Sequence, residues 1–173
     1  MRDAPRAPAV SAQTHWLVLL GTAAAVLVVD QTTKAIVRSR LPYGDTTRLG
    51  GIIRLHHTRN DGLLGGIVHG AAVPVGIGTV AGIAIALALY ARHREVAMRT
   101  RVAAGLLLGG AVGNLADRLR LGYVTDFIAR GDRNAFNLAD LAIYVGIGAL
   151  ALFSVLADRR RPGPPGQVPG DAR

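Results

Sequence analysis

The sequence contains no cysteine, and this absence excludes three kinds of site. A disulfide framework, a thiolate metal centre and a cysteine nucleophile all require thiol groups. Serine is also scarce, since Ser11, Ser39 and Ser154 are the only ones, and they lie in the N-terminal tail, at the end of the first apolar segment and within the last one. The H-E-x-x-H pattern of zinc proteases does not occur. Hydrolytic chemistry in this chain would therefore have to use carboxylates.

Lysine is nearly absent as well. Lysine and arginine together number 20, and Lys34 is the only lysine, so the other 19 are arginine. Lys34 follows Asp30 by four positions, which places both side chains on one helix face, where they can pair. A compact ammonium in a chain that otherwise uses guanidinium groups favours a specific role for this pair. The spacing alone leaves an alternative open, in which both side chains extend toward the membrane surface at a helix end.

Charge is missing from long stretches of the chain. Hydrophobic residues make up 50% of the sequence, 22 residues are glycine, and the mean hydropathy is +0.33. This composition is typical of a membrane protein. The formal charge of +9 could indicate nucleic-acid binding, but the arginines cluster between apolar runs and do not form one stripe. We attribute them to membrane topology and expect no nucleic-acid partner.

The apolar segments predict an all-α integral membrane protein with a bundle of four transmembrane helices. These helices span about residues 16–37, 70–90, 102–121 and 138–157 within one domain, residues 16–157. Residues 70–90 are the clearest span, because 21 uncharged residues exceed the roughly 20 needed to cross a bilayer. The first helix is uncharged only over residues 16–29, so it carries Asp30 in the membrane or at its edge. Residues 1–15 and 158–173 are expected to be disordered tails.

The long connection over residues 38–69 is expected to fold. Residues 49–58 partly alternate between apolar and polar and are rich in β-branched side chains, which predicts one or two short strands. Residues 60–62 predict a turn. The sequence therefore predicts a small β-region in the first loop. His56 and His57 would point to opposite faces of a strand without a carboxylate at ligand spacing, so we expect no metal and no cofactor.

Four helices would place both termini on one side of the membrane. Each side carries ten basic residues, but those in residues 91–101 and 159–161 lie directly beside helix ends, whereas the first loop is long. Dense basic residues next to helix ends mark the cytoplasmic side, so the termini are expected in the cytoplasm. Seven of the eleven acidic residues then fall on the outer side: Asp30, Asp45, Asp61, Asp117, Asp126, Asp132 and Asp140.

Two of these acidic residues lie at apolar boundaries without an adjacent base, Asp126 in TDFI and Asp140 in FNLAD. Two aspartates within hydrogen-bonding reach can share one proton, because like charges do not both ionise readily. One can then act as a base on water while the other polarises a carbonyl group. The residues alone leave two alternatives open, namely a non-catalytic bundle closed by caps and ion pairs and a small ion or proton transporter. The adjacent Asp117 and Arg118 are interpreted as a scaffold pair.

Four motifs in this chain resemble those of lipoprotein signal peptidase, or signal peptidase II. They are DQTTK at residues 30–34, NDG at 60–62, GNLADRLRLGYVTDFI at 113–128 and FNLAD at 136–140, in the order of the family. The resemblance implies a multi-pass aspartic endopeptidase of the bacterial inner membrane, active near the outer surface. Its substrates would be lipidated prolipoproteins, cut just before the diacylglyceryl-modified cysteine. Membrane lipid would be a further partner, and we expect a monomer.

Matched residue by residue, the resemblance implies that Asp126 and Asp140 form the catalytic pair. A supporting polar shell would orient the pair and the substrate: Asp30, Lys34, Asn60, Asn114, Arg118 and Asn137. The chain departs from the family pattern at residues 63–66 (LLGG), where family members usually carry an aromatic residue, and at residues 133–135 (RNA), where they usually carry an aromatic residue or proline. These two segments would cover the active site and contact the substrate in the family, so the departures affect that covering and not the catalytic pair.

Overall fold

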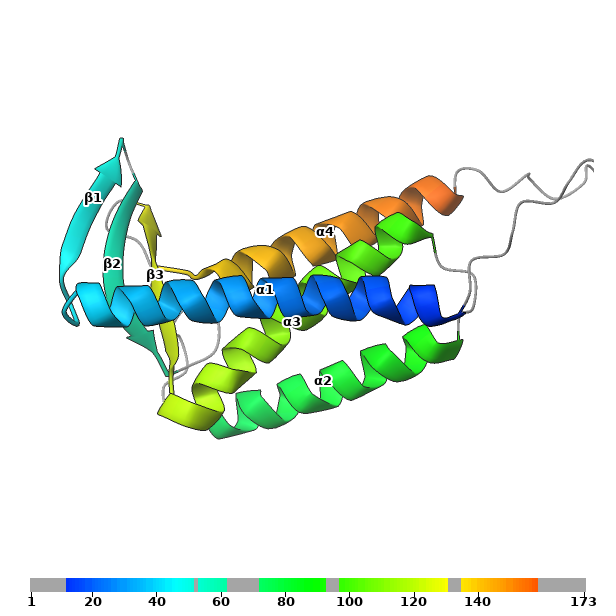
Figure 1. Ribbon diagram of the computed structural model, residues 1–173, viewed down its shortest axis with the longest axis horizontal. Helices are drawn as coiled ribbons and strands as arrows, with labels where there is room; N and C mark the ends of the chain where they lie inside the picture. The colour runs from blue at the N-terminus through cyan, green and yellow to red at the C-terminus, as the bar shows by residue number, and fades with distance from the viewer. Residues whose placement is uncertain (1–11, 52, 62–71, 93–96, 131–134, 159–173) are drawn as a thin grey trace, which may run out of the picture.

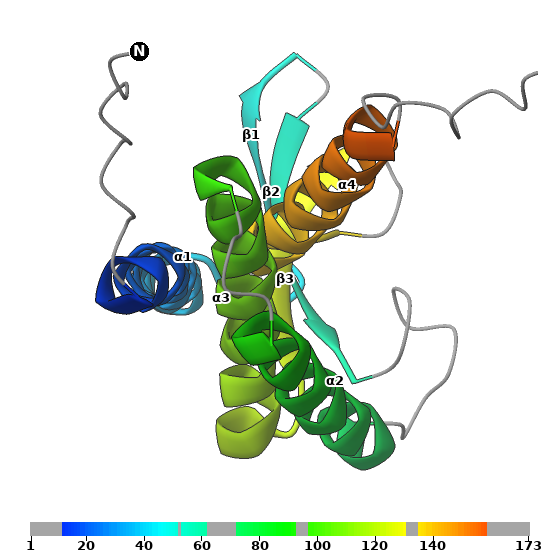
Figure 2. The ribbon, with the colours of Figure 1, turned by 90° about the vertical axis from the view of Figure 1, so that its right-hand side faces the viewer.

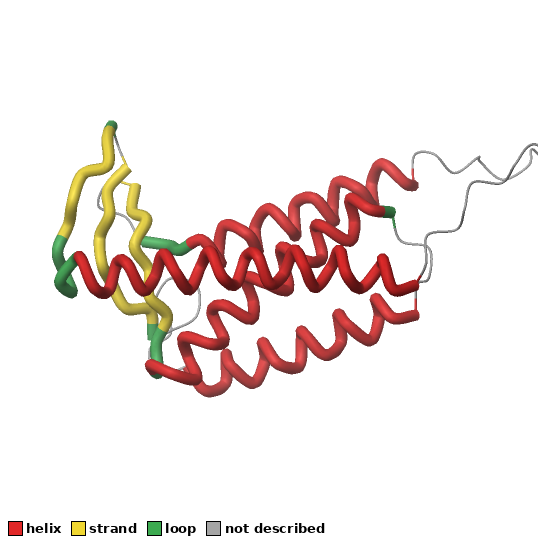
Figure 3. Tube along the Cα trace, in the orientation of Figure 1, coloured by secondary structure: helices red, strands yellow, loops and turns green. Residues whose placement is uncertain are grey.

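The structure, a computed structural model, describes residues 12–51, 53–61, 72–92, 97–130 and 135–158. Within these ranges the chain forms four helices and three strands: α1 (Ala12–Arg40), β1 (Thr46–Gly50), β2 (Ile53–Asn60), α2 (Ala72–Arg92), α3 (Met98–Leu121), β3 (Val124–Arg130) and α4 (Leu138–Asp158). The helices run lengthwise through the molecule, and the small sheet covers one end of them (Figure 1). The start of α1 and the end of α4 lie at the opposite end, away from the strands drawn in yellow in Figure 3.

Helix α3 is the centre of the bundle. Figure 2 shows α1, α2 and α4 arranged around it, and α3 contacts all three. Its sequence allows this close approach because glycines occupy the contact faces. A Cβ atom on Gly109 would lie 2.6 Å from the Ala23 carbonyl oxygen of α1, and one on Gly110 would collide with the Ala139 carbonyl oxygen of α4. Glycine at these positions lets backbones of neighbouring helices touch.

Gly109→Ala is therefore expected to destabilise the bundle by about 1–3 kcal/mol, because the added methyl group meets backbone atoms that cannot rotate away. Gly82→Ala on α2 is the matched control, since a Cβ atom there has nothing within 4 Å. The control should be neutral or stabilising by up to about 1 kcal/mol, because alanine favours helix. Thermal unfolding in detergent measures both. Equal shifts for the two variants would contradict the packing described above.

Among the described residues, two helices are long and apolar enough to span a membrane by length and composition. They are α1 over Trp16–Arg40, with a mean hydropathy of 1.5, and α4 over Leu138–Ala157, with a mean hydropathy of 2.0. The prediction that residues 70–90 would be the clearest span stays a prediction, because part of this range lies outside the described residues. The described apolar run of α2 covers only Pro74–Ala86.

The helices extend beyond the predicted ranges at several ends. Helix α1 begins at Ala12, so residues 12–15 are helical and not disordered as expected. Helix α3 begins at Met98 and not at residue 102. The additional turn of α3 is held against α4, where the Arg99 guanidinium lies 4.9 Å from the centre of the Phe153 ring. The expectations for residues 1–11 and 159–173 lie outside the described residues.

The sheet is antiparallel, with strand order β1-β2-β3. The prediction of strands in the first loop is confirmed by β1 and β2. The third strand was not predicted, and it belongs to the connection between α3 and α4. It pairs with β2 so that Thr58 lies opposite Asp126 and Asn60 lies opposite Val124. Pairing between these two connections brings residues of the first loop to Asp126.

Candidate active site

Polar side chains from six parts of the chain meet where the sheet joins the bundle. They are Asp30 and Lys34 on α1, Asn60 at the end of β2, Asn114 and Asp117 on α3, Asp126 on β3, Asn137 just before α4, and Asp140 in the first turn of α4. Most are buried although they are polar, and Asp30, Lys34, Asp117 and Asn137 are fully inaccessible to solvent. Burial of this kind requires partners for each polar group.

Both carboxylate oxygens of Asp126 accept a hydrogen bond from an asparagine. Asn60 Nδ2 donates to Oδ2 at 3.0 Å, and Asn137 Nδ2 donates to Oδ1 at 2.6 Å. Asp126 is only 2% exposed. Asn60 reaches it because β2 and β3 are paired, and Asn137 reaches it because the chain enters α4 beside β3. The two amides fix the orientation of the carboxyl group.

The pKa of Asp126, which lies in a strand outside the helices, is raised from its ordinary value to about 7. Burial is the largest cause, because it disfavours the charged form, and the negative charge of Asp140 acts in the same direction. The hydrogen bonds from Asn60 and Asn137 and the charge of Lys34 oppose this rise and are weaker together. Near neutral pH, therefore, a large fraction of Asp126 carries a proton.

Asp140 is held by the residue that precedes its helix. The Asp140 backbone N–H donates to Asn137 Oδ1 at 2.9 Å, and the Asn137 backbone N–H donates to Asp140 Oδ2 at 3.3 Å. This reciprocal arrangement caps the start of α4, and a carboxylate there is also stabilised by the helix dipole. Asn114 Nδ2 donates to the other oxygen at 2.7 Å. Asn137 thus binds both Asp126 and Asp140 and links the two carboxyl groups.

Lys34 is the centre of a buried ionic cluster beneath this pair. Its Nζ atom lies 2.9 Å from Asp30 Oδ2 and 3.2 Å from Asp117 Oδ2, and it donates to Asn114 Oδ1 at 2.9 Å. The predicted pairing of Asp30 with Lys34 is confirmed. The alternative, in which they extend to the membrane surface, is wrong because both side chains are fully buried. The ammonium group has one oxygen partner for each of its three hydrogens.

The cluster also holds the backbone on both sides of the carboxyl pair. Asp30 Oδ1 accepts the Ala139 backbone N–H at 2.9 Å, and Asp117 Oδ2 accepts the Thr125 backbone N–H at 3.0 Å. Ala139 precedes Asp140, and Thr125 precedes Asp126. The buried carboxylates of α1 and α3 therefore position the segments that carry the candidate catalytic residues.

The predicted site residues lie together in this arrangement of side chains. Arg118 lies one turn after Asn114, donates from Nη1 to the Asn114 carbonyl oxygen at 3.4 Å, and interacts electrostatically with Asp140 and Asp126. Asp117, interpreted with Arg118 as a scaffold pair, is fully buried against Lys34, and its charge also acts on Arg118. The sequence contains a signal for the position of Asp117 in the site. Asp117 follows Asn114 by three positions, which puts both side chains on the same face of the helix.

Gln31 and Thr125 were also missed by the sequence reasoning. Gln31 Nε2 donates to Asp117 Oδ1 at 3.1 Å and to the Gly113 carbonyl oxygen at the same distance. Thr125 accepts a bond at Oγ1 from Arg38 Nη1 at 3.0 Å. Neither residue type is distinctive in sequence, so only the fold identifies their contribution.

The fold, in which apolar helices carry a polar site at one end, is that of a membrane enzyme, as the comparisons with known proteins show. Two solved structures, each titled as a bacterial membrane enzyme, match with TM-scores of 0.76 and 0.72 at 27% and 29% identity. They cover 90% and 85% of this chain, and 96% and 95% of their own chains are matched.

The family model described as signal peptidase (SPase) II matches residues 22–156. The lipoprotein signal peptidase of Dehalococcoides mccartyi is 37% identical over 82% of this chain and 92% of its own length. That of an Azoarcus species is 35% identical over 92% of this chain and 93% of its own length. This chain therefore belongs to the signal peptidase II family and is a peptidase of the aspartic type.

Proposed function

We propose that this protein removes signal peptides from diacylglyceryl-modified prolipoproteins, cutting just before the lipidated cysteine, with Asp126 and Asp140 as the catalytic pair. The observation that supports this most strongly is Asn137, whose side chain and backbone bind both carboxyl groups. Beside it, the raised pKa of Asp126 allows one proton to remain on the pair at neutral pH. One ionised and one protonated carboxyl group is the state that an aspartic protease needs.

The proton transfers during cleavage follow from this protonation state of the two carboxyl groups. Ionised Asp140 takes a proton from a water molecule, whose oxygen bonds to the carbonyl carbon of the scissile peptide, while protonated Asp126 gives its proton to the carbonyl oxygen. Asp140 then passes the proton it took to the departing nitrogen as the carbon–nitrogen bond breaks. The hydroxyl formed on the carbonyl oxygen returns a proton to Asp126 as the carbonyl reforms. The pair is restored after each cleavage.

The supporting residues act on this pair in distinct ways. Asn60 and Asn137 hold the carboxyl group of Asp126, and Asn114 holds that of Asp140. The cluster formed by Asp30, Lys34 and Asp117 fixes the two backbones beneath them. Arg118 supplies positive charge beside both aspartates. All of these groups lie on one chain, which fits the proposal that the protein acts as a monomer.

The same proposal includes the topology of the chain. All four helices would cross the bacterial inner membrane, with both termini in the cytoplasm and the carboxyl pair near the outer surface. The site lies at the sheet end of the bundle, and the start of α1 and the end of α4 lie at the other end (Figure 1). Arg99 and Arg101 sit in the first turn of α3, at the end away from the site, as cytoplasmic ends of helices favour.

The rival transporter hypothesis is less well supported. A path for ions or protons would place acidic or basic groups through the depth of the helices. In the described residues of α2 no charge precedes Arg92, and α4 has none between Asp140 and Asp158.

Cleavage is tested with the detergent-purified protein and a diacylglyceryl-modified prolipoprotein, and mass spectrometry of the products locates the cut. The unlipidated precursor is the control substrate. Cleavage before the lipidated cysteine supports the proposal. Absence of any cut in the lipidated substrate by folded protein would contradict it.

The rate of cleavage is expected to fall above pH 7. The mechanism needs a proton on Asp126, and the fraction that carries one falls about tenfold per pH unit above a pKa of about 7. Between pH 7 and pH 9, kcat/KM should therefore drop by roughly 50-fold if folding is unchanged, because about half of Asp126 is already ionised at pH 7. The measurement is the initial rate against pH, with circular dichroism at each pH as the folding control. A rate that stays constant to pH 9 would contradict protonation of Asp126 as a requirement.

A further inference from the structure

A second group of polar side chains lies on the other face of the sheet. Side chains alternate along a strand, so Asn60, which binds Asp126, and its neighbour Arg59 point to opposite faces. Arg59 lies opposite Thr125 on β3, and Tyr123, just before β3, contacts Arg59. This face is therefore separate from the one that presents Asp126.

The guanidinium group of Arg59 is held between two tyrosines. Its central carbon lies 4.6 Å from the centre of the Tyr43 ring and 4.7 Å from that of the Tyr123 ring. A guanidinium over the faces of aromatic rings is attracted by their electron density and keeps its N–H donors for other partners. Arg59 is exposed, and among the described residues no carboxylate forms an ion pair with it. A planar fork with free donors matches the oxygens of a phosphate group.

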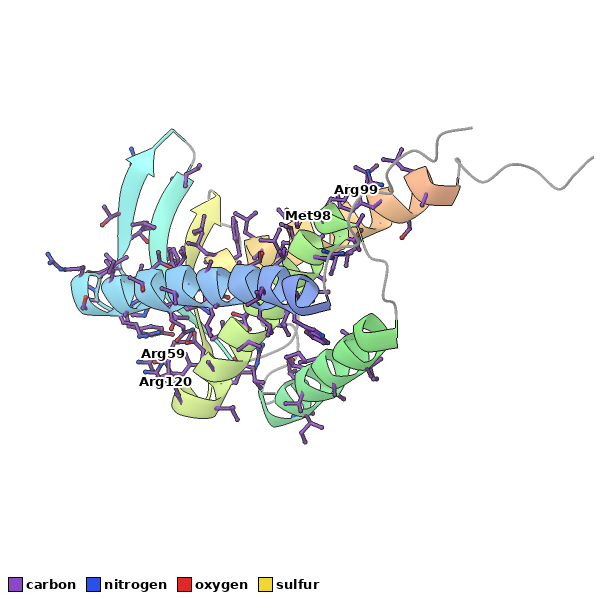
Figure 4. All side chains as sticks on the ribbon, turned by 45° about the vertical axis from the view of Figure 1, so that its right-hand side comes forward. Arg59, Met98, Arg99 and Arg120 are labelled. Carbon is purple, nitrogen blue, oxygen red and sulfur yellow. The ribbon has the colours of Figure 1, made fainter. Side chains whose placement is uncertain are left out.

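Two further arginines lie close to this fork. Arg38 Nη1 donates to Thr125 Oγ1, and Arg120 Nη1 donates to Gln31 Oε1 at 3.2 Å. In the view of Figure 4, Arg59 and Arg120 project from the same side of the molecule, at the sheet end of α1. The carboxylate nearest to Arg38 is Asp117 at 3.8 Å, and Asp117 already pairs with Lys34. The region therefore keeps a positive charge.

This basic region begins where the exposed apolar surface ends. Ile36 on α1 is 54% exposed and Leu119 on α3 is 77% exposed, as expected for side chains that face lipid tails. The next residues toward the sheet are basic, with Arg38 after Ile36 and Arg120 after Leu119. Arginine and tyrosine at the end of an apolar surface mark the level of the lipid headgroups.

We propose that Arg59, stacked between Tyr43 and Tyr123 and assisted by Arg120, binds the phosphate of an anionic phospholipid in the outer leaflet. The proposal rests on the membrane topology proposed above and on no catalytic step. Bound lipid would seat β2 and β3 against the membrane surface. These are the strands that carry Asn60 and Asp126, so the lipid would set the height of the site above the bilayer.

The test is lipid binding to the full-length protein in detergent, measured by native mass spectrometry. The probes are phosphatidylglycerol, which is anionic, and phosphatidylcholine, which also has a phosphate but no net charge. The wild type should retain phosphatidylglycerol preferentially, and Arg59→Gln should weaken its binding about fivefold, the effect of one arginine near a lipid surface. Arg59→Lys keeps the positive charge but loses the planar guanidinium donors. Its binding of phosphatidylglycerol should therefore be weaker than that of the wild type and stronger than that of Arg59→Gln. Arg48→Gln, at an exposed position on β1, is the control and should bind as the wild type does.

Several results would overturn the proposal. One is equal binding of the two lipids by the wild type, and another is an equal loss in Arg59→Gln and Arg48→Gln. Displacement of phosphatidylglycerol by millimolar inorganic phosphate would indicate a site for soluble anions. If Arg59→Gln does not fold, Arg120→Gln should weaken lipid binding in its place. Asp126→Asn should still bind phosphatidylglycerol, so failure of the catalytic proposal and failure of this one give different results.

Discussion

Asp126→Asn and Asp140→Asn are each expected to lower kcat by at least about 1000-fold, the range seen when a residue that transfers protons in catalysis is removed. An asparagine has nearly the shape of aspartate, but it neither accepts the proton of water nor gives one to the carbonyl oxygen. At Asp126 the change also removes the charge repulsion with Asp140. The folded protein should therefore remain, with its activity lost.

The measurement is cleavage of the lipidated prolipoprotein by each purified variant, with thermal unfolding recorded in parallel. Asp45→Asn is the matched control, because Asp45 is exposed and its side chain lies outside the network. The control should retain wild-type kcat. Substantial cleavage by folded Asp126→Asn or Asp140→Asn would show that the replaced aspartate does not transfer protons in catalysis. A loss of activity in Asp45→Asn would show that the assay does not report on the catalytic pair alone.

Lys34→Met is expected to destabilise the protein by about 3–5 kcal/mol, because it leaves buried carboxylates without their counter-charge. Lys34 is fully buried between Asp30 and Asp117, whose carboxylates hold the backbones of Ala139 and Thr125. Removal of the ammonium group therefore disturbs both segments of the catalytic pair. The measurement is the thermal unfolding temperature in detergent, together with the yield of folded protein.

Arg40→Met is the control for loss of a basic residue from α1, since Arg40 is exposed at its end. Its effect should stay within about 0.5 kcal/mol. The double variant Lys34→Met with Asp30→Asn should recover part of the stability, because one of the two stranded charges is removed. Unfolding of Lys34→Met at the wild-type temperature would contradict the buried cluster.

The helices and the ionic pair of α1 could be predicted from sequence because each has a local signal. Long uncharged runs identify helices, and the spacing of Asp30 and Lys34 identifies a shared face. Strand β3 has no such signal. Val124, Thr125, Asp126 and Phe127 are all buried, so the strand lacks the alternation of a half-exposed strand. Its strand character depends on pairing with β2, which is distant in sequence.

The individual members of the site could be named from the family motifs, but their arrangement could not. Asn137 is the clearest case. An asparagine followed three positions later by an acidic residue before an apolar run is a capping pattern, which predicts the bond between Asn137 and Asp140. The bond from Asn137 to Asp126 depends on how the start of α4 meets β3, and no local pattern reports that.

The shared proton of Asp126 and Asp140 is measured most directly by infrared spectroscopy of the carboxyl groups during a pH titration. The wild type at pH 6 should show a buried protonated carboxyl band that disappears as the pH rises through about 7. The band should be missing from Asp126→Asn. A spectrum in which both aspartates are ionised at pH 6, in protein that cleaves prolipoprotein at that pH, would contradict the catalytic mechanism proposed for this pair.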